Sequence, residues 1–405
     1  MKTKELELYI HIPFCVRKCK YCDFLSFASD NRTQQVYMEA LGREIAYYGP
    51  LMQAYEVTSI YIGGGTPSWL DLDLILRLLE QLWKHFRIRS DAEVSMECNP
   101  GTASKEKLYL CRINGINRLS IGLQSTEAEE LQVLGRIHTY EQFLKTFQMA
   151  RENGFKNINI DLMSGLPGQT VESYAKSLNR VARLKPEHIS AYSLIVEEGT
   201  PFYDWYAKDV QRQQEGLKPE HLPSEEELCQ MLALTNTYLE KERYHRYEIS
   251  NFARKGYECK HNVGYWTRAE YLGLGLGAAS LVGNARFSNT RDLKQYILET
   301  GQMRPKAFVD EAGVRACAEG TCLHIEGTAL TRQEQMEEFM FLGLRQTKGV
   351  SREEFQACFE TSMEAVYGDV IRQLMAQGLM ESCEGWVRLT EQGLDVSNYA
   401  MAQFL

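Results

Sequence analysis

Short apolar runs alternate with amphipathic segments along the first half of the chain. The apolar runs predict strands that end at Ile12 and lie at 57–62, 92–98, 117–123, 157–163 and 187–195. Between them, apolar residues recur at helical spacing over 31–49, 72–86, 104–114, 126–151 and 171–185. Alternating strands and helices form a parallel sheet with right-handed crossovers. We therefore predict an α/β fold, a partial (β/α)6 TIM-like barrel with reactive groups at the carboxyl ends of its strands.

The pattern changes after residue 200. Residues 201–222 are polar and interrupted, which suits a loop, whereas 224–243 are predicted helical, with Ser224 and Glu227 as a capping box. Beyond about 305 we expect a C-terminal winged-helix-like domain, built from helices at 333–346, 351–359, 362–377 and 390–404 and a hairpin of 379–382 with 386–389. The predicted division is 1–200 for the barrel, 201–305 for a barrel extension and 306–405 for the C-terminal domain.

Composition narrows the possible functions. A hydrophobic fraction of 44% and a net charge of −9 over 405 residues are those of an acidic globular protein, and they argue against a nucleic-acid partner. The predicted helix at 362–377 has Arg372 as its only basic residue, so we expect a docking or lid role for the C-terminal domain. Eleven cysteines, an odd number, indicate reduced thiols, and the strand pattern beginning near residue 5 leaves no room for a signal peptide. We expect a cytoplasmic protein.

Three cysteines, Cys15, Cys19 and Cys22, follow the first predicted strand at C-x3-C-x2-C spacing. A loop of this length directs three thiolates into one small volume, as an iron–sulfur cube requires. Three ligands for four irons leave one iron open to a small chelating molecule. A zinc site that recruits His11 as a fourth ligand is the alternative.

Basic residues surround these cysteines. Arg17, Lys18 and Lys20 lie within the loop. We expect their charge to lower the pKa of the thiols and favour metal binding.

Polar residues mark the ends of the next strands. Gly64, Gly65 and Thr66 follow the second strand, where glycine serves either the approach of a ligand or the dihedral angles of a turn. Glu97, Gln124 and Asp161 lie at or near the ends of the third, fourth and fifth strands; singly, each suits a hydrogen-bonded core group, but together they indicate a polar small-molecule site.

The cysteine spacing and three further segments, 9–15, 63–67 and 161–170, resemble the radical S-adenosylmethionine (SAM) superfamily. The likeness is to the branch that holds oxygen-independent coproporphyrinogen III dehydrogenases and heme chaperones. It implies that Cys15, Cys19 and Cys22 hold a [4Fe-4S] cluster. Arg136, otherwise a plain surface arginine, is implied to face the SAM carboxylate. The implied SAM-binding residues are Tyr9, Tyr21, Gly64, Gly65, Thr66, Glu97, Gln124, Arg136 and Asp161.

Two features favour the chaperone side of this branch over the dehydrogenase. The dehydrogenase pattern is C-x3-C-x2-C-x-C, with a fourth cysteine two residues after the third. This chain has Phe24 at that position. The dehydrogenases also carry a longer segment before the cluster. Radical decarboxylation of coproporphyrinogen III is therefore the alternative function, and radical chemistry on an unrelated substrate is a third.

A downstream segment supplies a heme hypothesis. Residues 261–266 match His-Asn-x-x-Tyr-Trp, which is associated with heme binding in the chaperone family. His261 suits an iron ligand, and Tyr265 and Trp266 offer flat faces to a macrocycle. Cys259 is a rival ligand, and a packed aromatic corner is the structural alternative.

The resemblance also implies partners. Heme would pass to acceptor hemoproteins, among them membrane-associated respiratory enzymes, and the protein would form a homodimer. The glycine–leucine run at 271–280 is implied to pass near SAM and is not followed by a dinucleotide-binding βαβ unit. Cys317 and Cys322 are assigned no role.

Overall fold

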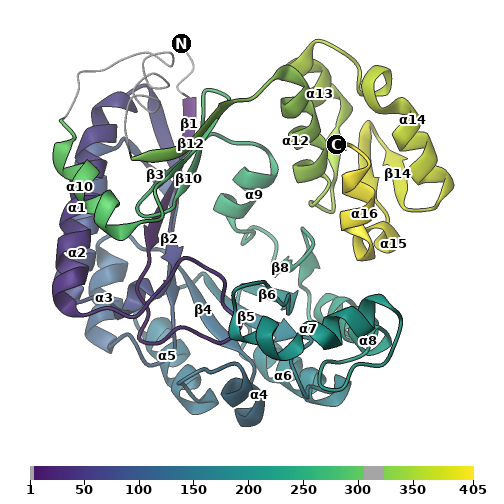
Figure 1. Ribbon diagram of the computed structural model, residues 1–405, viewed down its shortest axis with the longest axis horizontal. Helices are drawn as coiled ribbons and strands as arrows, with labels where there is room; N and C mark the ends of the chain where they lie inside the picture. Colours follow the sequence, from purple (N-terminus) through teal and green to yellow (C-terminus); the bar gives the residue numbers. More distant parts are fainter. Residues whose placement is uncertain (1–3, 305–322) are drawn as a thin grey trace.

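A mixed β-sheet forms the centre of the molecule in the computed structural model, which describes residues 4–304 and 323–405 (Figure 1). In this part of the chain the sheet has twelve strands, in the order β12-β11-β10-β9-β1-β2-β3-β4-β5-β6-β8-β7. Strands β9 and β1 to β6 run parallel, and antiparallel strands extend the sheet beyond β9 and beyond β6. The strands are β1 (Lys4–Ile12), β2 (Tyr55–Gly64), β3 (Ile88–Cys98), β4 (Arg118–Gln124), β5 (Ile158–Ser164), β6 (His188–Ser193), β7 (His245–Arg246), β8 (Asn251–Ala253), β9 (Tyr271–Leu274), β10 (Ala279–Val282), β11 (Ala285–Asn289) and β12 (His324–Ala329).

Helices follow the parallel strands and cover the outer face of the sheet (Figure 1). Their apolar sides pack on the buried strand residues and form one large core with them. The helices are α1 (Asn31–Leu51), α2 (Leu72–His85), α3 (Lys105–Ile113), α4 (Ala128–Val133), α5 (Tyr140–Glu152), α6 (Val171–Arg183), α7 (Pro201–Gln214), α8 (Glu225–Lys241), α9 (Lys260–Trp266) and α10 (Leu293–Gln302). This arrangement confirms the predicted α/β fold with a parallel sheet and alternating helices.

Two predictions about local structure were wrong. The segment 126–151 is not one helix, because Gly135 adopts φ 75° and separates α4 from α5. The segment 201–222 is not a plain loop, because Thr200 caps α7 and Pro201 occupies its first turn. Phe202 then anchors that helix, since its side chain is fully buried.

A small C-terminal domain has an apolar core of its own. Within the described residues, five helices and a three-stranded sheet in the order β13-β15-β14 form it, in a winged-helix-like arrangement. The predicted helix at 390–404 is two short helices. The elements are α12 (Arg332–Gly343), β13 (Val350–Ser351), α13 (Arg352–Phe359), α14 (Met363–Ala376), β14 (Met380–Cys383), β15 (Trp386–Leu389), α15 (Glu391–Asp395) and α16 (Ser397–Ala402).

The predicted domain limits stay a prediction, although one strand bears on them. Strand β12 lies beyond residue 306 and pairs antiparallel with β11 of the main sheet. Cys317 and Cys322 lie outside the described residues. Within 4–304 and 323–405, no helix is long and apolar enough to cross a membrane.

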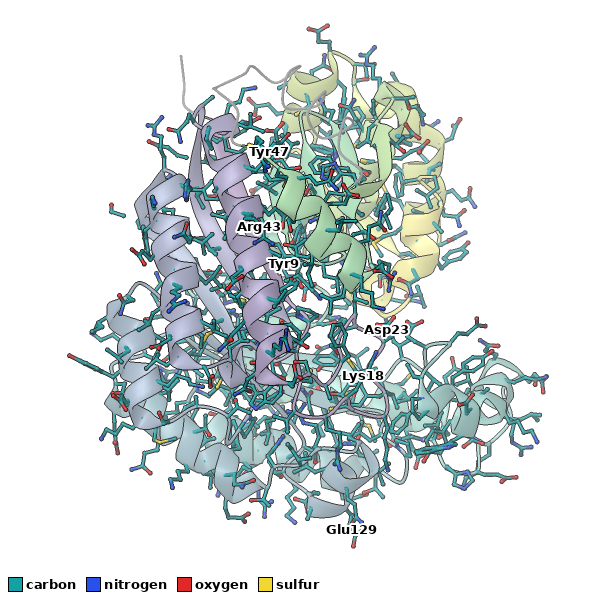
Figure 2. The ribbon with its side chains drawn as sticks, turned by 60° about the vertical axis from the view of Figure 1, so that its left-hand side comes forward. Tyr9, Lys18, Asp23, Arg43, Tyr47 and Glu129 are labelled. Carbon is teal, nitrogen blue, oxygen red and sulfur yellow. The ribbon has the colours of Figure 1, made fainter. Side chains whose placement is uncertain are left out.

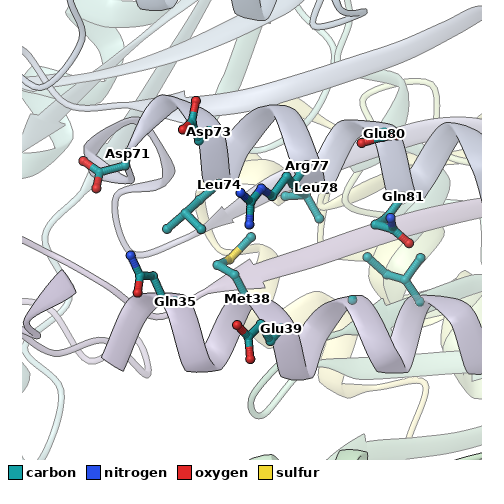
Figure 3. A pocket seen from close by; sticks show the side chains of 12 residues that line it. Gln35, Met38, Glu39, Asp71, Asp73, Leu74, Arg77, Leu78, Glu80 and Gln81 are labelled. Carbon is teal, nitrogen blue, oxygen red and sulfur yellow. The ribbon is translucent and has the colours of Figure 1, made fainter. Parts of the chain in front are cut away.

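One cavity is formed by two helices that cover the sheet. It measures about 590 Å³ and lies between α1 and α2 (Figure 3). Met38 and Glu39 of α1 face Leu74 and Arg77 of α2 across it. Two further cavities, of about 320 and 440 Å³, lie where the parallel strands end, and most of the residues predicted to be functional line them.

Candidate functional site

The three motif cysteines surround one cavity. Cys15, Cys19 and Cys22 are free thiols and all line the 320 Å³ cavity, here called the cysteine cavity. Backbone hydrogen bonds hold their loop: the Cys15 amide donates to Phe27 O at 3.0 Å, and the Lys20 amide donates to Leu134 O at 3.1 Å. Lys18 and Asp23 mark this loop in Figure 2, below the C-terminal helices.

Side-chain donors approach two of the sulfurs. Thr66 Oγ1 donates to Cys15 Sγ at 3.5 Å, and Arg136 Nη1 donates to Cys19 Sγ at 3.6 Å. Such contacts stabilise a thiolate more than a thiol. They fit a site whose sulfurs carry charge once metal is bound.

Burial outweighs the predicted effect of the basic residues, although the charge of Lys18 does act to lower the pKa of Cys22. Arg17 Nη2 donates to Gly135 O at 2.8 Å, and Lys18 Nζ donates to Phe24 O at 3.0 Å, so both charges are directed to backbone carbonyls. Burial raises the pKa of Cys15 and of Cys22 above the ordinary thiol value. Metal binding must therefore displace protons from these thiols.

His11 is not available as the fourth ligand of a zinc site. Both ring nitrogens of His11 are engaged: Nδ1 lies 3.0 Å from Tyr9 Oη, and Nε2 lies 2.9 Å from Leu25 O. Among the described residues, no group of three or more His, Cys, Asp or Glu side chains is arranged around a single ion. Three thiols spread around one cavity fit a polynuclear cluster, which is larger than one zinc ion.

Close packing explains the glycines after β2. Gly64 has φ 102°, and a Cβ there would lie 2.4 Å from the His11 ring. At Gly65 a Cβ would lie 2.7 Å from the carbonyl oxygens of Ile12 and Phe14. The glycines therefore let this turn lie directly against the start of the cysteine loop.

Two half-buried carboxyl groups line the same cavity. Glu97 accepts from Tyr61 Oη at 3.2 Å and from the Gly64 amide at 3.0 Å. Burial, with a contribution from Asp161, raises the pKa of Glu97 to about 7. Burial also raises the pKa of Asp161, which accepts from Asn159 Nδ2 at 2.7 Å. A cationic ligand would favour the ionised form of both groups.

The loop between α4 and α5 delivers Arg136 to the cavity. Its Nη2 donates to Gly122 O at 2.6 Å and to Asn99 Oδ1 at 2.7 Å. Its Nε is buried and has no partner within the described residues. Gln124 ends β4 with φ 72°, a left-handed conformation that turns the chain at the cavity wall. Its Oε1 accepts a hydrogen bond from Tyr192 Oη at 2.8 Å.

The structure brings together most of the residues predicted around SAM. Tyr9 and Thr66 are the exceptions: Tyr9 lines the neighbouring 440 Å³ cavity, and Thr66 lies behind Cys15. Sequence reasoning missed Asn99 and Tyr192, although both follow the same rule of polar residues at strand ends. The predicted residues that line the cysteine cavity are Tyr21, Gly64, Gly65, Glu97, Gln124, Arg136 and Asp161.

The predicted heme ligand is enclosed. His261 begins helix α9 and is 1% exposed. Its Nδ1 lies 2.8 Å from Ser59 Oγ and its Nε2 lies 3.1 Å from Tyr265 Oη. Burial, with the charge of Arg118, lowers the pKa of His261 to about 3, so the imidazole is neutral. This is the packed aromatic arrangement that the sequence left open.

The other members of this motif diverge. Cys259 is fully buried and its Sγ donates to Glu93 Oε1 at 3.4 Å. Trp266 points toward the C-terminal domain, where the Arg345 guanidinium lies 4.3 Å from its ring centroid. Tyr265 instead lines the 440 Å³ cavity. The side chains of the motif therefore lie in three different places. His261 is buried beside Ser59, Tyr265 lines the 440 Å³ cavity, and Trp266 faces the C-terminal domain.

Comparison with known proteins agrees with this geometry. Residues 9–181 match the radical SAM superfamily, and residues 330–396 match the HemN C-terminal domain. The heme chaperone HemW of Bacillus subtilis is 36% identical over 398 residues, which cover 98% of this chain and 98% of the relative. The heme chaperone HemW of Escherichia coli is 33% identical over 418 residues, covering 100% and 99%.

A solved structure shares the whole architecture. The radical SAM enzyme coproporphyrinogen III oxidase (HemN) from Escherichia coli superposes with a TM-score of 0.81 at 27% identity. The match covers 99% of this chain and 90% of that chain. The chain therefore belongs to the radical SAM superfamily and, within it, to the family of these HemW relatives.

Proposed function

We propose that this protein is a heme chaperone that binds a [4Fe-4S] cluster, SAM and heme, and delivers heme to acceptor hemoproteins such as respiratory enzymes. Membership of the radical SAM superfamily implies the cluster and SAM. The full-length likeness to two proteins named heme chaperones supports the heme part. The observation that carries the proposal is that Tyr265 of the heme-associated motif opens into a cavity beside the cysteine cavity.

The residues of the cysteine cavity divide naturally between the parts of SAM. Cys15, Cys19 and Cys22 would hold three irons and leave the fourth to the amino and carboxylate groups of SAM. Arg136 would face the carboxylate, and Glu97 would take the ammonium or a ribose hydroxyl. When bound, the cluster supplies an electron that can cleave the sulfonium.

Coproporphyrinogen III decarboxylation is the second candidate. The superposition on the oxidase from Escherichia coli favours it, because both chains share the barrel and the C-terminal domain. Phe24 argues against it, since the dehydrogenase pattern has a cysteine there. Its side chain is 65% exposed at the rim of the cysteine cavity, where an added thiol group would stand.

Parallel measurements on anaerobically reconstituted protein separate these candidates. We expect stoichiometric heme binding and no product from coproporphyrinogen III with SAM. Cys19→Ala should lose the cluster, whereas the matched variant Cys229→Ala, at an exposed thiol on α8, should keep it. Turnover of coproporphyrinogen III, or failure to bind heme, contradicts the chaperone function. A homodimer is part of the proposal, and its mass can be measured in the same preparations.

A further inference from the structure

The 590 Å³ cavity between α1 and α2 differs from the two strand-end cavities, because none of the residues predicted to be functional lines it. We call it the helix groove. Its volume lies within the usual range for binding sites. Figure 3 shows α1 on one side and α2 on the other, with Met38, Leu74 and Arg77 directed into the space between them. The outer face of the barrel therefore carries a concave surface of its own.

Two glycines show where α1 and α2 touch and where they part. A Cβ at Gly49 would lie 2.7 Å from His85 Cβ, so close packing of the two helices requires glycine there. Gly42 lies about two turns earlier on α1 and lines the helix groove. A Cβ at Gly42 would meet nothing within 4 Å. The space of the groove therefore reaches the backbone of α1.

Neither backbone conformation nor packing among the described residues accounts for Gly42. It lies in the interior of the 21-residue helix α1 and does not have a positive φ. Glycine is less favourable than alanine at such a position, because it loses more backbone freedom on folding. A bare backbone does, however, allow another molecule to approach closely. The glycine thus indicates an occupant that lies directly on α1 at this point.

Carboxylates surround the groove. Glu39 of α1 and Asp71, Asp73 and Glu80 of α2 line it with exposed side chains. Arg77 is the one cation among the lining residues, and within 4–304 and 323–405 no ion pair joins it to these carboxylates. The net negative charge repels nucleic-acid phosphates and anionic membranes and attracts a basic segment. The groove therefore selects a positively charged occupant.

The floor between these carboxylates is apolar. Met38 and Ile45 of α1 and Leu74 and Leu78 of α2 form it. An apolar floor with a charged rim suits an amphipathic helix, whose apolar face enters the groove while its charged flanks meet the rim. The α2 wall spans residues 71–81, a length of about 15 Å, which matches about three turns of a docked helix.

We propose that the helix groove docks a lysine- or arginine-rich amphipathic helix of a partner protein, with Gly42 at the point of closest approach and the four carboxylates around its basic side chains. The groove starts near the first turns of α1 and α2, on the side of the barrel where the parallel strands end. A docked partner is therefore held on the same side of the barrel as the cysteine cavity. This inference goes beyond the proposed function and does not depend on heme, SAM or the cluster.

A labelled helical peptide of leucine, alanine and lysine, titrated into the full-length protein, tests the groove. Fluorescence anisotropy should show binding with a Kd of about 1–100 µM, and no binding of a peptide with glutamate in place of lysine. Gly42→Leu fills the groove without a change of charge and should weaken binding at least about tenfold. Glu80→Lys should weaken it about three- to tenfold, whereas the matched charge reversal Glu172→Lys, at an exposed carboxylate of α6, should leave it unchanged.

Two further measurements locate the peptide and separate binding from folding. Carbodiimide coupling followed by mass spectrometry should join peptide lysines to Asp73 and Glu80. Gly42→Ala should raise the urea midpoint of unfolding, because alanine favours the helix. A lowered midpoint would show that the fold itself needs this glycine, and it overturns the inference.

Four binding results also overturn it. They are a wild-type protein that does not bind the lysine peptide, wild-type affinity in Gly42→Leu, an equal loss in Glu172→Lys, and undiminished binding of a peptide with serine in place of leucine. The last result would mark a site for cations alone. Each of them leaves the proposed binding of heme and SAM untouched.

Discussion

Glu44 is a fully buried carboxyl group of α1. Three donors reach it: the Gly275 amide at 2.8 Å, Asn289 Nδ2 at 2.7 Å and Tyr296 Oη at 2.6 Å. Burial outweighs these hydrogen bonds and raises the pKa of Glu44 to about 7. The group links α1 to the turn after β9 and to α10, so its ionisation affects the side of the barrel opposite the C-terminal domain.

Stability should therefore fall with rising pH through this group. The pKa of Glu44 is higher in the folded state than in the unfolded state, so its contribution is complete below about pH 4.5 and disappears as the pH rises through about 7. The full effect is at most about 3 kcal/mol. In urea unfolding between pH 5 and 8, Glu44→Gln should show a shallower decline than wild type. Identical slopes in the two proteins would remove this explanation.

Arg136 should matter for SAM more than for the cluster. Its guanidinium uses two nitrogens, Nη1 toward Cys19 Sγ and Nη2 toward Gly122 O and Asn99 Oδ1, a geometry that one ammonium group cannot reproduce. We expect Arg136→Lys to retain iron and sulfide while it weakens SAM binding at least about tenfold by calorimetry. The control Arg372→Lys, at an exposed arginine of α14, should bind SAM as wild type does. Unchanged affinity in Arg136→Lys refutes this role.

The cysteines and the strand-end polar residues could be predicted because local spacing and strand direction determine where they lie. The environment of His261 could not, because Ser59 lies about two hundred positions earlier and contacts it only after the sheet has formed. The cavity that Tyr9 lines could not be predicted for a similar reason. Strand β1 borders two cavities, and the alternation of its side chains does not specify which cavity each one reaches.

Gly264, a variable position of the His-Asn-x-x-Tyr-Trp motif, lets helix α9 pack against the sheet. A Cβ at Gly264 would lie 2.1 Å from Glu7 Oε1, so the helix backbone rests on a buried carboxyl group of β1. Burial raises the pKa of Glu7 to about 8, which keeps the group mostly neutral at pH 7. The seating of α9 determines where Tyr265 and Trp266 point.

Gly264→Ala should displace α9. Overpacking of this kind costs about 1–3 kcal/mol, and we expect that loss in urea unfolding together with weaker heme binding. Gly301→Ala is a suitable control, because a Cβ there meets nothing within 4 Å. Wild-type stability in Gly264→Ala would show that the helix does not rest on Glu7.

At the scale of elements, the long periodic segments were predictable and their interruptions were not. Helix α8 begins at the capping box of Ser224 and Glu227, as predicted. The break at Gly135 was not predicted because apolar residues continue across it at helical spacing. Helix α7 was not predicted because most of its residues are polar. Its buried Phe202 packs beside Tyr21.

The C-terminal domain is fastened to the barrel by a buried carboxylate. Glu338 of α12 accepts from Arg268 Nε at 2.9 Å and from Arg286 Nε at 2.6 Å. All three side chains lie where β11 and the end of α9 meet the domain. The domain therefore stands beside the motif that carries Tyr265.

Loss of this carboxylate should loosen the domain without unfolding it. Glu338→Gln leaves two arginines without their counter-charge, and we expect faster hydrogen exchange across α12 and α9. The neighbouring Glu337→Gln, whose carboxylate accepts from Gln333 Nε2 at 2.8 Å on the same helix, is the matched control. Equal exchange in the two variants would show that the ion pair does not hold the domain.

At the scale of the whole molecule, the barrel and the small C-terminal domain were predictable from the alternation of strands and helices. The extension of the sheet was not. Strands β10 to β12 are short and lack a strong apolar run, and their pairing with the barrel edge depends on contacts between distant segments.

The proposed function depends on three thiolates that would hold a cluster with one iron open to SAM. Electron paramagnetic resonance of the reduced, reconstituted protein, recorded with and without SAM, tests this most directly. We predict the signal of a reduced [4Fe-4S] cluster whose line shape changes when SAM is added. A cluster signal that SAM leaves unaltered, or protein that takes up zinc but no iron–sulfur cluster, contradicts the account.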